Sequence, residues 1–206
     1  GYYSREEDAF GRVVERYDNT VLVDAGTKVA DFLVSNRSVD VIEGPLGSGK
    51  TKALCARIMR HAQEQVKSPI DGLRRTRWAV IRNTQPELKT TTIKTWLDWF
   101  PEERFGKMVH GAPISHNLSW PMKDGTKVEL EVLFLALDRP DHIKKLLSLE
   151  VTGAWMNEAR EQPKAILDGL TGRVGRYPRA QDGGATWSGV IMDTNPPDDD
   201  HWWYQV

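Results

Sequence analysis

The segment 44–51, Gly-Pro-Leu-Gly-Ser-Gly-Lys-Thr, constrains the fold more than any other part of the chain. It fits the phosphate-binding pattern G-x-x-x-x-G-K-[ST] at every fixed position, between a predicted strand at 39–43 and a predicted helix at 50–66. Glycines let the backbone bend so that successive N–H groups point at phosphate oxygens, and the helix start adds partial positive charge. We therefore expect a nucleotide to bind at Gly44, Pro45, Leu46, Gly47, Ser48, Gly49, Lys50 and Thr51.

Two residues of this loop have individual expected roles. Lys50 can reach the β- and γ-phosphates, and the Thr51 hydroxyl can ligate Mg²⁺. The Asn-Lys-x-Asp signature of GTPases is absent from the sequence, which favours ATP over GTP. The expected cofactors are therefore ATP and Mg²⁺.

Composition excludes several classes of protein. The chain has 206 residues, a formal net charge of -1 and one cysteine, Cys55, so an intramolecular disulfide and a cysteine-based zinc site are both excluded. The longest apolar run, 132–137, is far too short to span a membrane. Near-neutral charge excludes bulk electrostatic coating of nucleic acid, but it allows a local basic patch.

Strands and helices are expected to alternate along most of the chain, which favours a mostly parallel sheet covered on both faces. The expected strands lie at 39–43, 78–82, 151–156 and 190–193, and the expected helices at 5–17, 26–34, 50–66, 86–100, 140–147 and 164–170. The turn signal Asp124-Gly125 predicts an antiparallel hairpin around 114–137. The sequence thus predicts an α/β P-loop NTPase fold of the ASCE/RecA-like type. We expect a single domain over 1–206, with a helical segment at 1–36 and the core at 37–206.

A phosphate loop needs an acidic partner at the end of a neighbouring strand. Three apolar strands end in such a group: at Asp138, at Asn157-Glu158 and at Asp193. The residues alone leave all three open, and Asp138 can also cap a following helix. We favour the second, with Glu158 activating the attacking water and Asn157 as a weak or water-mediated Mg²⁺ partner.

Several segments together resemble the ATPase domain of tailed-phage large terminase subunits over about 25–206. They are the phosphate loop, the segment 137–145, the run Ala-Trp-Met-Asn-Glu-Ala at 154–159, the run Thr-Asn-Pro-Pro at 194–197, and Trp202-Trp203. The phosphate loop alone is unspecific, whereas the runs at 154–159 and 194–197 in combination are much more specific.

The resemblance implies a motor that hydrolyses ATP to move double-stranded DNA into a procapsid. It implies that Glu158 is the catalytic carboxylate that activates water, that the Thr194-Asn195 step senses the γ-phosphate and links hydrolysis to movement, and that the adenine lies near Phe32 and Asn36 in the N-terminal segment. It also implies a homo-oligomeric ring on the portal, a small terminase subunit as partner, and a location in the host cytoplasm without a membrane. The nuclease domain of large terminases is expected to lie outside these 206 residues. The alternatives are another DNA-stimulated P-loop ATPase, of helicase or recombinase type, or a nucleotide-binding assembly module that hydrolyses nothing.

The sequence departs from the family pattern in two places. Asn157 replaces the usual acidic residue, and the phosphate loop lacks the arginine that many members carry. A charge-stabilising arginine or lysine must then come from elsewhere. Arg82 could act within the same chain. Candidates for acting on a neighbouring subunit are Arg139, Lys144, Lys145, Arg173 and Arg176.

Three basic groups could follow DNA phosphates without reading bases. They are Arg74-Arg75-x-Arg77, Lys144-Lys145, and the set Arg173, Arg176 and Arg179. The first is expected to precede its strand, at the sheet edge opposite the nucleotide, and it ranks lowest for DNA contact.

Overall fold

A seven-stranded sheet forms the centre of the computed structural model, which describes residues 2–7, 13–18, 27–45, 47–137 and 142–196. In spatial order the strands are β3 (Val39–Glu43), β9 (Gly189–Thr194), β8 (Gly153–Met156), β4 (Leu73–Arg82), β7 (Lys127–Ala136), β6 (Ile114–Pro121) and β5 (Met108–His110). The first five are mutually parallel, and β6 and β5 join antiparallel. The predicted α/β fold and its hairpin are therefore confirmed.

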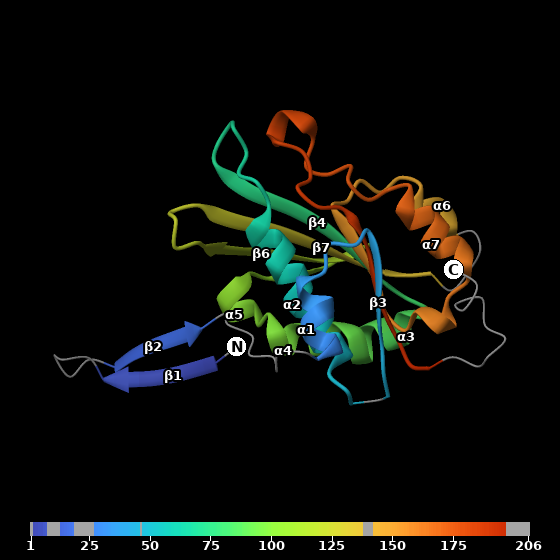
Figure 1. Cartoon of the computed structure of the whole chain (residues 1–206), viewed down its shortest axis with the longest axis horizontal. Helices are drawn as coiled ribbons and strands as arrows, with labels where there is room; N and C mark the ends of the chain where they lie inside the picture. The colour runs from blue at the N-terminus through green and yellow to red at the C-terminus, as the bar shows by residue number, and fades with distance from the viewer. Residues whose placement is uncertain (1, 8–12, 19–26, 46, 138–141, 197–206) are drawn as a thin grey trace.

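Helices cover both faces of this sheet (Figure 1). One face carries α1 (Lys28–Val34), α2 (Lys50–Glu64), α5 (Glu102–Phe105) and the helical segment 85–99; the other carries α6 (Ile143–Leu146) and α7 (Lys164–Thr171). Each face has its own apolar core. The larger one packs α2 against Trp78 and Trp155, and the smaller one packs α7 against Met156 and Met192. Apolar runs on β4, β8 and β9 supply both, as expected for strands buried on two sides.

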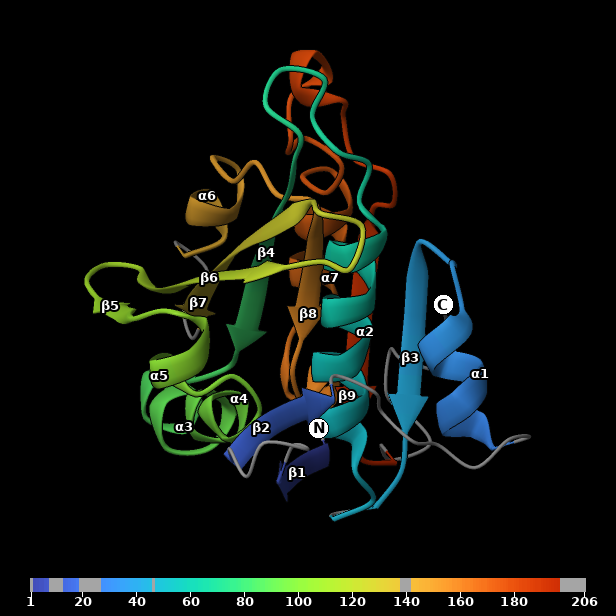
Figure 2. The same ribbon diagram turned by 90° about the vertical axis from the view of Figure 1, so that its left-hand side faces the viewer.

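The carboxyl ends of the parallel strands meet at one edge of the sheet, where ligands bind in open α/β folds. Figure 2 shows the arrows of β3, β8 and β4 running toward the edge where α2 begins. In the register, Glu43 lies beside Thr194, and Met156 lies beside Met192. The fold therefore brings the ends of four strands, far apart in the sequence, next to the phosphate loop.

The helix predicted at 86–100 is divided into three parts. It consists of α3 (Gln85–Glu87), a π-helical segment η1 (Leu88–Ile93) and α4 (Lys94–Trp99). Two threonine hydroxyls donate to carbonyls four residues earlier, Thr90 to Pro86 at 2.9 Å and Thr91 to Glu87 at 2.6 Å. Because these side chains compete with the backbone donors for the same carbonyls, the ordinary α-helical ladder is loosened here.

Two expectations are wrong in detail. The helix predicted at 5–17 is instead an antiparallel pair, β1 (Tyr2–Glu7) and β2 (Val13–Asp18), which forms a separate small sheet. Consecutive valines and tyrosines in these segments favour extended backbone, which outweighs the helical spacing. The basic run 74–77 lies inside β4 and not before it, because this strand begins at Leu73.

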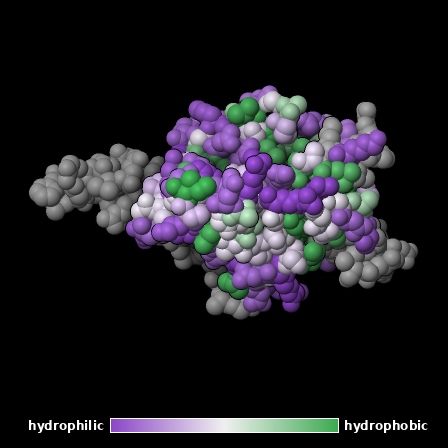
Figure 3. All heavy atoms as spheres, turned by 90° about the horizontal axis from the view of Figure 1, so that it is seen from above, coloured by the Kyte–Doolittle hydropathy of each residue, from purple (hydrophilic) through white to green (hydrophobic). Residues whose placement is uncertain are grey.

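In the part of the chain that the structure describes, every helix is too short or too polar to cross a membrane. Figure 3 shows one face of the molecule, on which hydrophobic side chains form small separate groups among hydrophilic ones.

Candidate nucleotide-binding site

The phosphate loop links the end of β3 to the start of α2. Gly47 and Gly49 have φ of 77° and 81°, in the left-handed region that glycine adopts without strain, and Gly49 is the N-cap of α2. A Cβ on Gly44 would lie 2.9 Å from Ser48 Oγ. The Gly44 N–H donates to the Thr194 carbonyl at 3.2 Å, which ties the loop to β9. Leu46 lies outside the described residues.

The Lys50 side chain extends across the phosphate loop and contacts its first residues. Its side chain is buried, and Nζ donates to Gly44 O at 2.5 Å, Pro45 O at 2.9 Å and Asn195 Oδ1 at 2.9 Å. An ammonium group has three donors, so these three oxygens use all of them. The structure therefore brings Lys50 and Asn195 into direct contact. A charged phosphate oxygen would bind the same ammonium more strongly than these neutral acceptors do.

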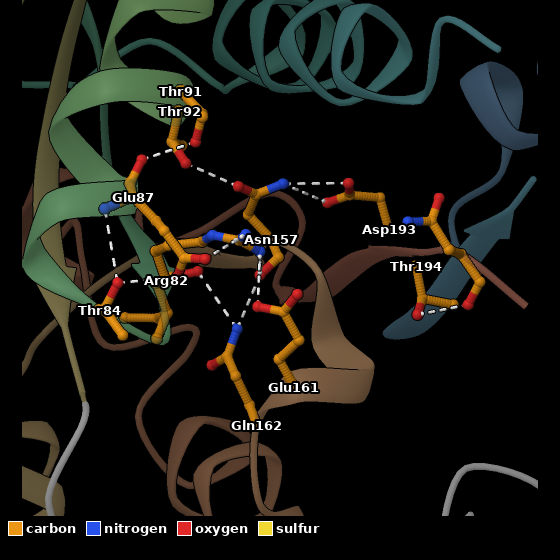
Figure 4. A network of polar contacts seen from close by, with 12 residues as sticks. Arg82, Thr84, Glu87, Thr91, Thr92, Asn157, Glu161, Gln162, Asp193 and Thr194 are labelled. Carbon is orange, nitrogen blue, oxygen red and sulfur yellow. Dashed lines mark hydrogen bonds and ion pairs between the residues drawn. The ribbon is translucent and has the colours of Figure 1, made fainter. Parts of the chain in front are cut away.

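Asn157 follows β8 and bridges two other elements (Figure 4). Its Oδ1 accepts a hydrogen bond from Thr92 Oγ1 of η1 at 2.6 Å, and its Nδ2 donates to Asp193 Oδ1 and Oδ2 at 3.1 and 3.0 Å. The Asn157 amide is buried, and both its oxygen and its nitrogen have protein partners.

Asp193 on β9 is a buried carboxylate at the same edge. Trp155 Nε1 donates to its Oδ1 at 2.6 Å. Burial raises the pKa of Asp193 to about 6, helped by the charge of Glu158 and opposed by the hydrogen bonds from Trp155 and Asn157 and by Lys50. Its charge also contributes to the raised pKa of Cys55, which is mainly due to burial. Asp193 therefore faces the first turns of α2.

Glu158 combines a left-handed backbone conformation with a buried carboxylate oxygen that has no hydrogen-bond partner. Its φ is 52°, and among described residues it is the one non-glycine residue with positive φ. Such a conformation costs on the order of 1 kcal/mol or more, and it is concentrated at functional sites. Its Oε2 is buried and accepts no hydrogen bond. A carboxylate oxygen held without a donor can accept a proton or a hydrogen bond from a water molecule.

Arg82 ends β4 and is surrounded by carboxylates. Its guanidinium lies 3.2 Å from Glu161 and 3.6 Å from Glu87, and Nη1 donates to the Asn157 carbonyl at 3.5 Å. Gln162 Nε2 donates to the same carbonyl at 2.8 Å. Burial is the main cause of the raised pKa of Glu161. Arg82 therefore joins the segment after β8 to α3, as Figure 4 shows.

Other residues named from the sequence are less closely associated with this edge. Asp138 and Arg139 lie outside the described residues, as does the side chain of Lys145. Lys144 and Arg176 are exposed, and Arg173 is half-buried. Phe32 is buried, with the Arg57 guanidinium 4.5 Å from its ring centroid. The Asn36 side chain accepts a hydrogen bond from Arg60.

Sequence reasoning missed Thr92 and the indole of Trp155 as members of this site. The run Thr90-Thr91-Thr92 was the available signal, since three consecutive β-branched hydroxyl residues are unusual in a helix interior.

The donor set fits a magnesium ion held together with a nucleotide. Among the described residues no group of three or more His, Cys, Asp or Glu side chains could hold a metal by itself. Mg²⁺ commonly binds through one or two protein oxygens together with substrate phosphates and water. Thr51, in the first turn of α2, and the buried carboxylate of Asp193, near the carboxyl end of β9, supply oxygens of the required kind.

Structural comparison identifies proteins with this architecture, whereas no family model and no curated protein matches the chain by sequence. The large terminase of the thermophilic bacteriophage D6E matches with a TM-score of 0.59 and 12% identity over 87% of this chain. A D6E structure in complex with ADP gives a TM-score of 0.57 and 13% identity over 87% of this chain. The chain has the fold of the large terminase ATPase domain. It spans 38% of the length of each of these D6E chains.

A second phage supports the same assignment of the fold. The large terminase ATPase domain of Thermus phage P74-26 matches with a TM-score of 0.53 and 12% identity, over 88% of this chain and 68% of that one. This similarity covers most of the residues of the chain.

Proposed function

We propose that this chain is the ATP-hydrolysing motor domain of a viral large terminase and that it drives double-stranded DNA into a procapsid. The observation that carries the proposal is the convergence of Lys50, Asn195 and Glu158 at one sheet edge within a terminase fold. A terminase of this fold has been solved with ADP, which supports nucleotide binding here. The proposed core is 37–206, within one ATPase domain.

In this function, Lys50 and the loop amides bind the β- and γ-phosphates. The Thr51 hydroxyl and a side-chain oxygen at the carboxyl end of β8 or β9 hold Mg²⁺, which neutralises phosphate charge. Glu158 accepts a hydrogen bond from the attacking water, since its Oε2 has no protein donor. Arg82 orients this segment through the Asn157 carbonyl. Its ion pairs with Glu87 and Glu161 make direct action on the phosphate dependent on a rearrangement.

Asn195 is placed to respond to the nucleotide. Its side-chain oxygen accepts from Lys50, so a γ-phosphate that attracts the ammonium competes directly with this contact. Arg160, two residues after Glu158, donates to the Pro196 carbonyl at 3.2 Å. A change at Asn195 can therefore reach the segment after Glu158, which links phosphate release to movement.

The proposed partners are double-stranded DNA without sequence preference, other copies of the chain in a ring on the portal, and a small terminase subunit. The proposed location is the host cytoplasm, at the procapsid. The exposed Lys144 and Arg176 remain candidates for DNA contact or for action on a neighbouring subunit.

The test is ATP turnover and DNA packaging by the full-length protein with procapsids and linear DNA. We expect DNA-dependent turnover and packaging, both abolished by Lys50→Ala. Lys52→Ala, two residues along the same helix and exposed, is the matched control and should retain both. Turnover that needs no procapsid and unwinds or pairs strands would favour a helicase or recombinase. Nucleotide binding without turnover under packaging conditions would favour an assembly module.

A further inference from the structure

Two side chains at this sheet edge, Asn157 after β8 and Asp193 on β9, offer oxygens for the Mg²⁺ of a bound nucleotide. Asn157 stands where a terminase-like sequence usually has an acidic residue, and it was expected to contact Mg²⁺. Its Oδ1, the one atom able to do so, accepts a 2.6 Å hydrogen bond from Thr92 instead. Its Nδ2 is directed at Asp193 and cannot ligate a cation. Asn157 is therefore already used as a hydrogen-bond bridge.

Asp193 provides the missing carboxylate at the same edge. Strand side chains alternate between faces, so Asp193 lies on the same face as Ile191, and Asn157 on the same face as Trp155. Ile191 and Trp155 belong to the apolar core under α2. The charge of Lys50 lowers the pKa of Asp193, and the charge of Asp193 raises the pKa of Cys55; these two residues precede and follow Thr51 in α2. Its carboxylate thus lies on the side of the sheet where the nucleotide's metal is expected.

The hydrogen bonds explain why position 157 is an amide. Asn157 Nδ2 lies 3.0 Å from Asp193 Oδ2, so an aspartate at both positions would bring two carboxylates together and raise the pKa of one strongly. With an amide at 157, Asn157 and Asp193 together carry one negative charge, and the Asn157 amide holds the Asp193 carboxylate in place. Trp155 and Asn157 both donate to Oδ1, whereas Oδ2 accepts only from Asn157 among the described residues, which leaves one of its lone pairs for another partner.

We propose that Asp193, and not Asn157, is the protein carboxylate that holds Mg²⁺ of the bound nucleotide, with Asn157 and Thr92 as positioning residues. The proposal rests on the proposed nucleotide-binding function, because the nucleotide phosphates supply the other oxygens.

The test measures Mg²⁺-dependent nucleotide affinity without requiring turnover. A fluorescent ATP analogue is titrated into the full chain in EDTA and in Mg²⁺, and Mn²⁺ bound to the protein–nucleotide complex is measured by electron paramagnetic resonance. Asp193→Asn should bind as wild type does in EDTA but lose at least about tenfold of the gain given by Mg²⁺. Asp168→Asn, an exposed acid on α7, is the control and should keep the full gain.

The reciprocal variants decide between the two positions. Asn157→Asp alone should not increase the Mg²⁺-dependent gain, whereas Asn157→Asp combined with Asp193→Asn should restore much of it by returning the charge to β8. Tighter Mg²⁺ binding in the single Asn157→Asp variant, or an undiminished gain in Asp193→Asn, would overturn the assignment. If Asp193→Asn does not fold, the double variant decides: a folded double variant that binds nucleotide but lacks the gain also overturns it.

Failure of the broader proposal is recognisable separately. A wild-type chain that binds no ATP analogue in EDTA or in Mg²⁺ overturns the proposed function and this assignment together. Normal Mg²⁺-dependent binding by wild type, unchanged in Asp193→Asn, overturns this assignment alone.

Discussion

The two ends of β4 hold their charges in opposite ways. At the amino end, three arginines lie in partly exposed ion pairs with nearby carboxylates: Arg74 with Asp124, Arg75 with Asp71 and Glu129, and Arg77 with Glu131. At the carboxyl end, the single Arg82 is buried and shared between Glu87, Glu161 and a backbone carbonyl. Charges that are paired in water are replaceable, whereas those in a shared buried network depend on one another.

Buried polar atoms without hydrogen-bond partners occur along β4, including Thr76 Oγ1 and Trp78 Nε1, but at its carboxyl end they belong to charged groups. At the carboxyl end, Glu158 Oε2 and Arg82 Nε are buried without hydrogen-bond partners, and Glu158 has a left-handed backbone. Each such feature costs stability, so a protein retains it where another function requires it. The amino end of β4 carries the denser basic cluster, but each of its arginines is already paired with a carboxylate.

The largest expected effect is at Glu158. Glu158→Gln keeps the shape of the side chain but removes its ability to accept a proton, so turnover should fall at least about 100-fold while ATP affinity is retained. Single-turnover phosphate release measures the first quantity, and equilibrium binding measures the second. Glu150→Gln, an exposed glutamate that precedes β8, should keep most of the activity. Near-normal turnover by Glu158→Gln would show that another group activates the water.

Arg82→Ala should destabilise the fold by about 2 kcal/mol, because it leaves two carboxylates facing a vacated site. This figure is below that of a fully buried pair, since Glu87 and Glu161 are 41% and 30% exposed. Urea unfolding measures it. Arg82→Lys keeps the charge and should lose less. Equal stability of Arg82→Ala and wild type would mean that the network is not held by this charge.

A buried histidine far from the nucleotide site should dominate the acid sensitivity of folding. Burial, then the charges of Arg60 and Arg57, lower the pKa of His61 to about 3, and its ring stacks 3.9 Å from that of Trp187. The unfolded chain therefore binds this proton near pH 6.5 and the folded chain only near pH 3, so the contribution of His61 to stability is full above pH 6.5 and falls as the pH drops through that window. At pH 5 this contribution is about 2 kcal/mol smaller than at pH 7, and protonation of Asp193, whose pKa is raised to about 6, offsets part of the loss.

The matched variant for this prediction is His61→Gln, which cannot titrate. Its unfolding free energy should be lower than that of wild type at pH 7, and the difference between the two proteins should shrink by about 2 kcal/mol between pH 7 and pH 5. The same pH dependence in both proteins would assign the effect to other groups.

The smallest effect is expected at the amino end of β4. Arg77→Ala removes a partly exposed ion pair with Glu131 and a ring contact with Tyr177, and it should cost about 1 kcal/mol or less. Urea unfolding and DNA-stimulated turnover should both change little. A loss of DNA stimulation would show that this end, and not the exposed lysine and arginine candidates, contacts DNA.

Local patterns predicted much of the fold. The strand, loop and helix around 39–64 follow from apolar periodicity and from a fixed glycine spacing, both of which lie within a few adjacent residues. The contact between Asn157 and Asp193 could not be predicted in this way. The two residues are 36 positions apart and meet only because their strands are neighbours in the sheet. The sequence therefore named both positions without showing that their side chains are hydrogen-bonded to each other.

The wider turn of η1 makes the length of this segment significant. Deleting one residue from 88–93 would let the helix close to the ordinary 3.6-residue repeat, because the wider turn holds one extra residue without rotating the flanking turns. Trp96, beyond the wider turn, would stay buried, whereas Thr92, inside it, would lose its position opposite Asn157. A relative of this chain with a shorter helix here would need a different donor for the amide, so sequence gaps at this point should accompany changes at position 157.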